Sequence, residues 1–130
     1  MIVVDANILA YLYLPADLTE NAERLLKDDP QWAAPLLWRS EFRNILTGYM
    51  RRKTLTLDES RALQAEAEDL MTGNEYEVDS HRVLELVNES VCSAYDCEYV
   101  ALARELGVKL VTMDAKLLKA FPRYTLPLAR

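Results

Sequence analysis

The stretch YDCEYVALARELGVKLVTMD, residues 95–114, decides the fold class. Residues 95–106 place apolar side chains at helical spacing, and Gly107 follows them, where glycine commonly ends a helix. The next five residues, VKLVT, are rich in β-branched side chains and predict a buried strand, with a short helix after Asp114. A helix that leads directly into an apolar strand is typical of a parallel α/β sheet.

The same alternation runs through the rest of the chain. Strands are expected over residues 2–4, 32–34, 76–78 and 108–112, with an edge strand at 124–128. Helices are expected from about residue 6, over residues 19–28 with Thr19 as the cap, and from Pro35 to about Lys53. Two more are expected, one from a Thr56–Glu59 capping box to near Gly73 and one from a Ser80 cap to about Val91. We therefore predict a single α/β domain over residues 1–130, a three-layer α/β/α sandwich around a parallel sheet.

Composition restricts the class of protein further. The 130 residues are 51% hydrophobic, which fits one ordinary globular domain. Cys92 and Cys97 are too few for a disulfide framework and are interpreted as small buried side chains. The chain starts without a basic leader, and its longest apolar run, residues 8–14, is too short to cross a bilayer. We expect a soluble cytoplasmic protein with no membrane contact.

Two acidic residues follow predicted strands. Asp5 ends the first strand and Asp114 comes two residues after the strand at 108–112. In parallel sheets, ligands bind beyond the carboxyl ends of the strands, so both residues are candidates for a site. Aspartate is also a good helix N-cap, and a helix follows each position, so capping is an alternative interpretation for either one alone.

Two further acidic residues lie on the inward sides of helices. Glu41 borders an apolar stripe, and Asp96 precedes Tyr99 by three positions on the inward face of its helix. A carboxylate at such a place needs a partner. An ion pair with an arginine such as Arg52 is the alternative for Glu41, and a capping box with Ser93 is the alternative for Asp96.

Four carboxylates gathered at one edge of a sheet would repel one another. Each pair about 4 Å apart costs on the order of 4 kcal/mol at an effective dielectric of 20. Bound divalent cations remove this cost, and carboxylate oxygens suit Mg²⁺ or Mn²⁺. Sites of this kind activate water and clamp a phosphate for in-line displacement.

Four segments of the sequence, in order, resemble the motifs of PIN-domain nucleases. They are VDAN at residues 4–7, SEFRN at 40–44, SAYDCEYVALA at 93–103 and TMD at 112–114. By length and motif, the chain is similar to VapC-type toxins of toxin–antitoxin pairs. The resemblance implies an α/β/α sandwich and a Mg²⁺- or Mn²⁺-dependent endoribonuclease that leaves 5′-phosphate and 3′-hydroxyl ends.

The resemblance also implies roles for individual residues and partners. The implied metal ligands are Asp5, Glu41, Asp96 and Asp114. Asn7 and Thr112, and less directly Asn44, are implied to position ligands or the attacking water. The implied partners are RNA, a second copy of the chain in a homodimer, and a cognate antitoxin whose tail blocks the acidic site. The apolar helix containing residues 11–14 is a candidate dimer surface.

A net charge of -6 is unusual for a protein that binds nucleic acid. Five cations are nevertheless concentrated on the one helix expected from Pro35 to about Lys53, and they are candidates for contacts with RNA phosphates: Arg39, Arg43, Arg51, Arg52 and Lys53. The alternative is that they form an ordinary solvated face.

The sequence gives less support to nucleotide binding, serine-hydrolase chemistry, phosphoryl transfer or purely non-catalytic binding. The chain has three glycines, no glycine-rich phosphate loop and no serine-hydrolase motif, and His81 is its only histidine. A phosphatase-like phosphoryl-transfer enzyme is one alternative, but such a site usually has a second Asp where this chain has Asn7. A non-catalytic module that binds RNA or protein is the other alternative, and the four filled acidic positions argue against it.

Overall fold

The computed structural model describes residues 1–129 and contains a five-stranded sheet with seven helices around it. In chain order the elements are β1 (Ile2–Val4), α1 (Ala6–Tyr13), α2 (Thr19–Asp28), β2 (Trp32–Pro35), α3 (Trp38–Arg51), α4 (Leu57–Met71), β3 (Glu75–Tyr76), α5 (Ser80–Asn88), α6 (Ala94–Leu106), β4 (Leu110–Val111), α7 (Ala115–Ala120) and β5 (Thr125–Leu126). The predicted alternation of strands and helices is confirmed.

All neighbouring strands are parallel, in the order β3-β2-β1-β4-β5. The central strand, β1, pairs through Val3 with Ala33 on one side and with Leu110 on the other. These three side chains are fully buried, as the apolar strand sequences predict for a sheet that is covered on both faces.

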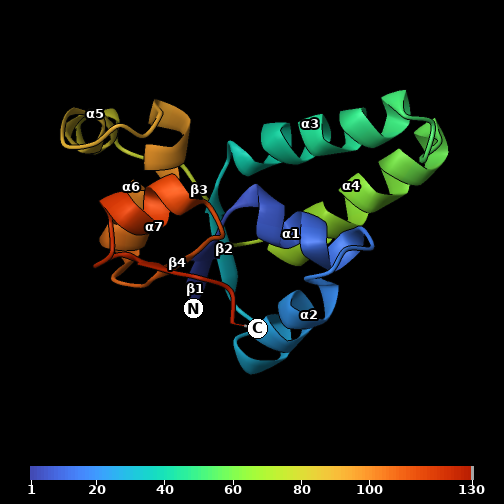
Figure 1. The fold of residues 1–130 in the computed structure, drawn as a ribbon, viewed down its shortest axis with the longest axis horizontal. Coiled ribbons are helices and arrows are strands. Elements are labelled where there is room, and N and C mark those ends of the chain that lie inside the picture. Colours follow the sequence, from blue (N-terminus) through green and yellow to red (C-terminus); the bar gives the residue numbers. More distant parts are fainter. Residues whose placement is uncertain (130) are drawn as a thin grey trace.

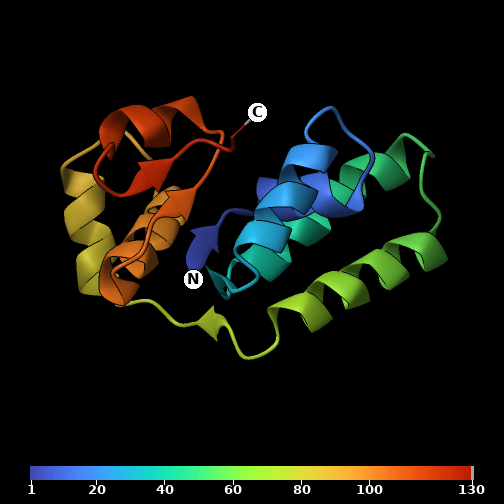
Figure 2. The same cartoon turned by 90° about the horizontal axis from the view of Figure 1, so that it is seen from below.

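The helices form two layers, so the predicted α/β/α sandwich is confirmed (Figure 1). Helices α1 to α4 lie on one side of the sheet, and α5 to α7 lie on the other (Figure 2). Helix α6 contacts β1, β2 and β4. Helix α4 contacts β2 from the opposite side of the sheet. Helices α3 and α4 pack side by side and extend away from the sheet (Figure 1).

One predicted helix start and two predicted caps were wrong. Pro35 is the last residue of β2, because the amide of Leu36 still donates to the carbonyl of Tyr76 and continues the ladder. Thr19 lies inside α2, where its hydroxyl donates to the Leu14 carbonyl, so it is not the cap. The cap of α5 is the side chain of Asp79, one residue before the predicted Ser80.

Two predicted helix ends are confirmed by their hydrogen bonds. Thr56 and Glu59 form the complete capping box at the start of α4. Gly107 ends α6 with φ of 69°, a left-handed conformation that glycine adopts without the steric cost paid by other residues.

Residues 11–14, the candidate dimer surface, pack against the chain's own core, and positions 11–13 remain partly exposed. Leu14 is only 3% exposed, and α1 contacts α2, α3 and α4. Tyr13 packs edge-on against Phe42. Within residues 1–129, no helix is long and apolar enough to cross a membrane.

Candidate active site

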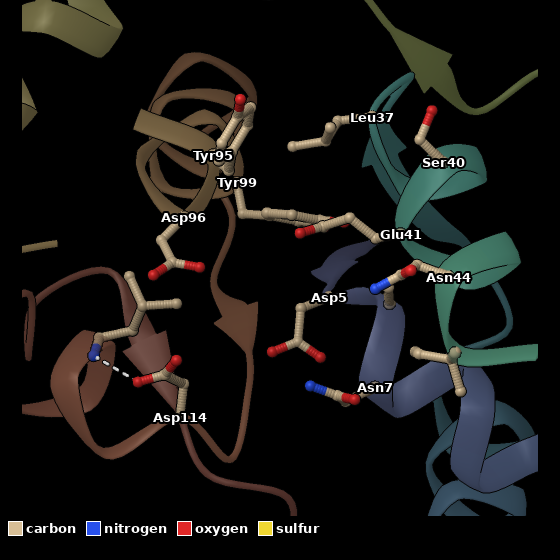
Figure 3. A pocket seen from close by; sticks show the side chains of 13 residues that line it. Asp5, Asn7, Leu37, Ser40, Glu41, Asn44, Tyr95, Asp96, Tyr99 and Asp114 are labelled. Atoms are coloured by element: carbon tan, nitrogen blue, oxygen red, sulfur yellow. Dashed lines mark hydrogen bonds between the residues drawn. The ribbon is translucent and has the colours of Figure 1, made fainter. Parts of the chain in front are cut away.

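A pocket of about 380 Å³ opens beyond the carboxyl ends of the strands, and all four predicted carboxylates line it (Figure 3). Asp5 and Asp114 meet there because β1 and β4 are neighbours in the sheet and a carboxylate follows each strand. Glu41 comes from the first turn of α3, and Asp96 from the first turn of α6. The pocket therefore lies where an open parallel sheet places its ligands.

Asp5 is the most deeply held of the four. It is 8% exposed, and its Oδ1 accepts a 3.1 Å hydrogen bond from the amide of Ile8. Its Oδ2 accepts a hydrogen bond from the hydroxyl of Thr112, which is fully buried. The same Thr112 oxygen accepts a 3.0 Å hydrogen bond from the backbone amide of Asp114, so one threonine connects the Asp5 carboxylate to the backbone at Asp114.

The capping interpretation of Asp5 and Asp114 also holds. Asp5 is the N-cap of α1, and Asp114 is the N-cap of α7, where its Oδ1 accepts from the amides of Lys116 and Leu117. The capping bonds use only Oδ1 of each residue. Capping thus orients these carboxylates in the pocket, and the two interpretations do not exclude each other.

Glu41 has a partner that the sequence did not reveal. The hydroxyl of Tyr99 donates a 2.6 Å hydrogen bond to Glu41 Oε1. The alternative of an ion pair with arginine is not realised among residues 1–129, and Arg52 instead lies over the ring of Tyr49. Burial, together with the charge of Glu41, holds the pKa of the Tyr99 phenol far above its ordinary value, so Tyr99 remains a donor.

Asp96 lies on the opposite wall of the pocket. The hydroxyl of Ser93 accepts a 3.0 Å hydrogen bond from the Asp96 amide, so Ser93 caps α6 as the alternative interpretation suggested. The side chain of Asp96 is nevertheless half-buried and lines the pocket.

The electrostatics of the pocket are those of crowded negative charge. Burial, aided by the charge of Glu41, raises the pKa of Asp5 to about 6. Burial and the charge of Asp96 raise the pKa of Glu41, and burial and the charge of Asp114 raise the pKa of Asp96. Glu41, Asp96 and Asp114 thus each destabilise the ionised form of another pocket carboxylate, while Lys116 partly offsets this for Asp96.

The residues fit a divalent cation in donor type and in charge. Carboxylate oxygens are the ligands that Mg²⁺ and Mn²⁺ prefer, and no lysine or arginine within residues 1–129 forms an ion pair with any of the four. Among the described residues, no three Asp, Glu, His or Cys side chains are gathered closely enough to surround one ion.

The predicted supporting residues lie at the same place. Asn7 and Asn44 line the pocket, with the Asn7 amide next to Asp5 (Figure 3). Thr112 lies behind Asp5 and does not line the pocket.

The five cations around α3 lie outside the pocket wall. Arg39 forms ion pairs with Glu75 and Glu68, at 2.6 and 3.0 Å. Arg43 donates to the Ser40 hydroxyl, which itself lines the pocket. The two ion pairs of Arg39 give this residue a structural role that its position in the sequence did not indicate.

Three pocket features were missed at the level of sequence. Tyr99 holds Glu41, Lys116 places a positive charge near Asp96, and Tyr95 lines the pocket although it is 62% exposed. The spacing contained one usable signal, since Tyr99 follows Asp96 by three positions and shares its helix face.

Comparisons with known proteins agree with this architecture. The PIN domain family model matches residues 2–123. Ribonuclease VapC3 from Pyrobaculum aerophilum is 31% identical over 133 residues, which cover 97% of this chain and 98% of the relative. FitAcB from Neisseria gonorrhoeae superposes with a TM-score of 0.76 at 15% identity, covering 97% of this chain and 96% of that one. A toxin–antitoxin complex from Klebsiella pneumoniae superposes with a TM-score of 0.72 at 20% identity, covering 100% and 99%.

The two structural similarities establish the fold, and the sequence matches extend over almost the whole chain. The resemblance that four short motifs indicated is therefore confirmed: this chain belongs to the PIN-domain family.

Proposed function

We propose that this chain is a metal-dependent endoribonuclease and the toxin of a toxin–antitoxin pair. The observation that carries the proposal is the convergence of four carboxylates, without a basic ion-pair partner in residues 1–129, on the pocket of a PIN-domain chain. The 31% identity to a relative named as a ribonuclease supports RNA as the substrate.

The ligands for Mg²⁺ or Mn²⁺ would be Asp5, Glu41, Asp96 and Asp114. When bound, the cation supplies positive charge for the phosphodiester and lowers the pKa of a water for in-line attack. Asn7 and Asn44 present amide groups at the pocket wall, where they would orient the substrate phosphate or the water. The expected products carry a 5′-phosphate and a 3′-hydroxyl.

The chain's own residues prepare the pocket for this role. The Thr112 hydroxyl holds Oδ2 of Asp5 by a hydrogen bond. The amides at the starts of α1 and α7 hold the Oδ1 atoms of Asp5 and Asp114. Lys116 lies close enough to Asp96 to offset part of the rise in its pKa, and would also attract a phosphate to this side of the pocket.

A phosphate track along α3 would extend the contact with RNA. Arg43, Arg51, Arg52 and Lys53 remain candidates for it, and Arg39 would have to leave Glu75 and Glu68 to contribute. The similarity to a solved toxin–antitoxin complex supports a cognate antitoxin as the protein partner. We further propose a homodimer that acts in the cytoplasm, and light scattering at micromolar concentration tests the dimer.

Cleavage of a panel of structured RNAs with Mg²⁺, with Mn²⁺ and with EDTA tests the activity. We expect discrete cuts that require the metal and disappear in Asp96→Asn. The matched control is Asp79→Asn, which makes the same change at the start of α5 outside the pocket. Wild-type cutting by Asp96→Asn would remove Asp96 from the site, and cutting in EDTA would overturn the metal dependence.

A further inference from the structure

The Tyr99–Glu41 hydrogen bond is a contact that the ligand set alone does not require. Tyr99 comes from α6 and Glu41 from α3, and these helices belong to opposite layers of the sandwich (Figure 3). The two atoms are 2.6 Å apart, and the tyrosine is only 2% exposed. The bond therefore connects the two layers beside the pocket.

Glu41 needs such a restraint more than the aspartates do. Asp5 and Asp114 are held by the backbone amides of the helices they cap, whereas Glu41 lies inside a helix on a longer side chain. Glu41 also shares the pocket with three other carboxylates, so like charge opposes its ionised form at this position. Without a donor, the carboxylate would gain by turning towards solvent.

We propose that Tyr99 is a positioning residue for the metal site, which holds Glu41 through Oε1 and leaves Oε2 available to the cation. This inference rests on the proposed function, because it assumes that Glu41 is a metal ligand. Without this bond the cation itself would have to fix the Glu41 side chain, so the lost preorganisation is expected to weaken cation binding about tenfold.

The test is Tyr99→Phe, which removes the hydroxyl and keeps the ring that fills the core. Mn²⁺ binding is measured without RNA, by calorimetry and by the rise in melting temperature on adding Mn²⁺. The matched control is Tyr13→Phe, which removes a hydroxyl that donates to the Glu66 carbonyl outside the pocket. We expect about tenfold weaker Mn²⁺ binding for Tyr99→Phe and no change for Tyr13→Phe.

A double variant separates positioning from a general loss of stability. Glu41→Asp keeps the charge but shortens the side chain, so the bond to Tyr99 is lost in that variant as well. If Tyr99 acts through Glu41, adding Tyr99→Phe to Glu41→Asp weakens Mn²⁺ binding little further. Fully additive losses would mean that Tyr99 acts by another route, and would overturn the inference.

The outcomes also separate this inference from the proposed function. If the wild type binds Mn²⁺ and Tyr99→Phe binds it equally well, the positioning role is wrong and the metal-dependent function stands. If the wild type shows no Mn²⁺ binding at all, the metal-dependent function is wrong and the inference falls with it.

Discussion

The hydroxyl of Thr112 donates a hydrogen bond to Asp5 Oδ2, although the two residues are 107 positions apart in the sequence. The contact forms because β1 and β4 are adjacent parallel strands that end at the same edge of the sheet. Thr112 also accepts a hydrogen bond from the amide of Asp114. One buried side chain thus connects the Asp5 carboxylate to the backbone that carries Asp114.

Thr112→Val should therefore damage both the fold and the activity. The variant keeps the shape of the side chain but leaves a buried carboxylate oxygen and an amide without their partner, which costs about 1–3 kcal/mol. Urea unfolding measures the free energy of unfolding, and RNA cleavage measures the activity. The control is Thr125→Val, which removes another buried hydroxyl, one that donates to the Phe121 carbonyl away from the pocket. Equal losses of activity in the two variants would contradict a specific role for Thr112.

Asp5→Asn should abolish cleavage while stabilising the metal-free protein at neutral pH. The folded-state pKa of Asp5, about 6, lies above the ordinary value of 3.8, so folding favours the protonated form. Below about pH 4 the residue imposes no penalty, and the free energy of unfolding then falls as the pH rises towards 6. The full penalty above pH 6 is on the order of 2–3 kcal/mol.

Melting curves in EDTA between pH 4 and pH 8 measure this effect. Asn at position 5 is still able to cap α1, so the gain should come from loss of the buried charge. Asp79→Asn, at the cap of α5, is the control and should keep the wild-type fall in stability. A variant at position 5 with the wild-type pH profile would show that Asp5 is not the group responsible.

Replacing arginines along α3 should separate RNA binding from folding. Arg51→Ala and Arg43→Ala are expected to weaken binding of RNA to the inactive Asp96→Asn protein, and each should reduce the salt slope by about one unit. Arg39→Ala is expected mainly to lower the melting temperature, because it breaks ion pairs with Glu75 and Glu68.

Fluorescence anisotropy at several salt concentrations measures RNA affinity in each variant. Arg82→Ala, on the exposed side of α5, is the control and should bind RNA like the parent protein. An unchanged salt slope in Arg43→Ala and Arg51→Ala would exclude the proposed phosphate track.

The parts of the structure that the sequence predicted are those with local causes. Runs of β-branched residues mark β1 and β4, and the capping box of Thr56 depends only on a residue three positions away. The convergence of Asp5 and Asp114 followed from a rule about strand ends, because that rule needs only the fact that the sheet is parallel.

The parts that were missed depend on contacts between distant segments. Tyr99 reaches Glu41 across 58 positions, and this requires α3 and α6 to meet at one edge of the sheet. Pro35 fits the first turn of a helix equally well by local preference, and only its pairing next to Tyr76 makes it part of a strand. Ser80 and Asp79 are adjacent residues of similar capping ability, so the chemistry of the sequence did not separate them.

The double use of Asp5 and Asp114 as helix caps and pocket carboxylates has a genetic consequence. Asparagine caps a helix about as well as aspartate but carries no charge, so it preserves the start of α1 or α7 and removes a proposed ligand. Aspartate and asparagine codons differ by a single base. A single base change would therefore convert this chain into a folded copy that lacks one proposed metal ligand.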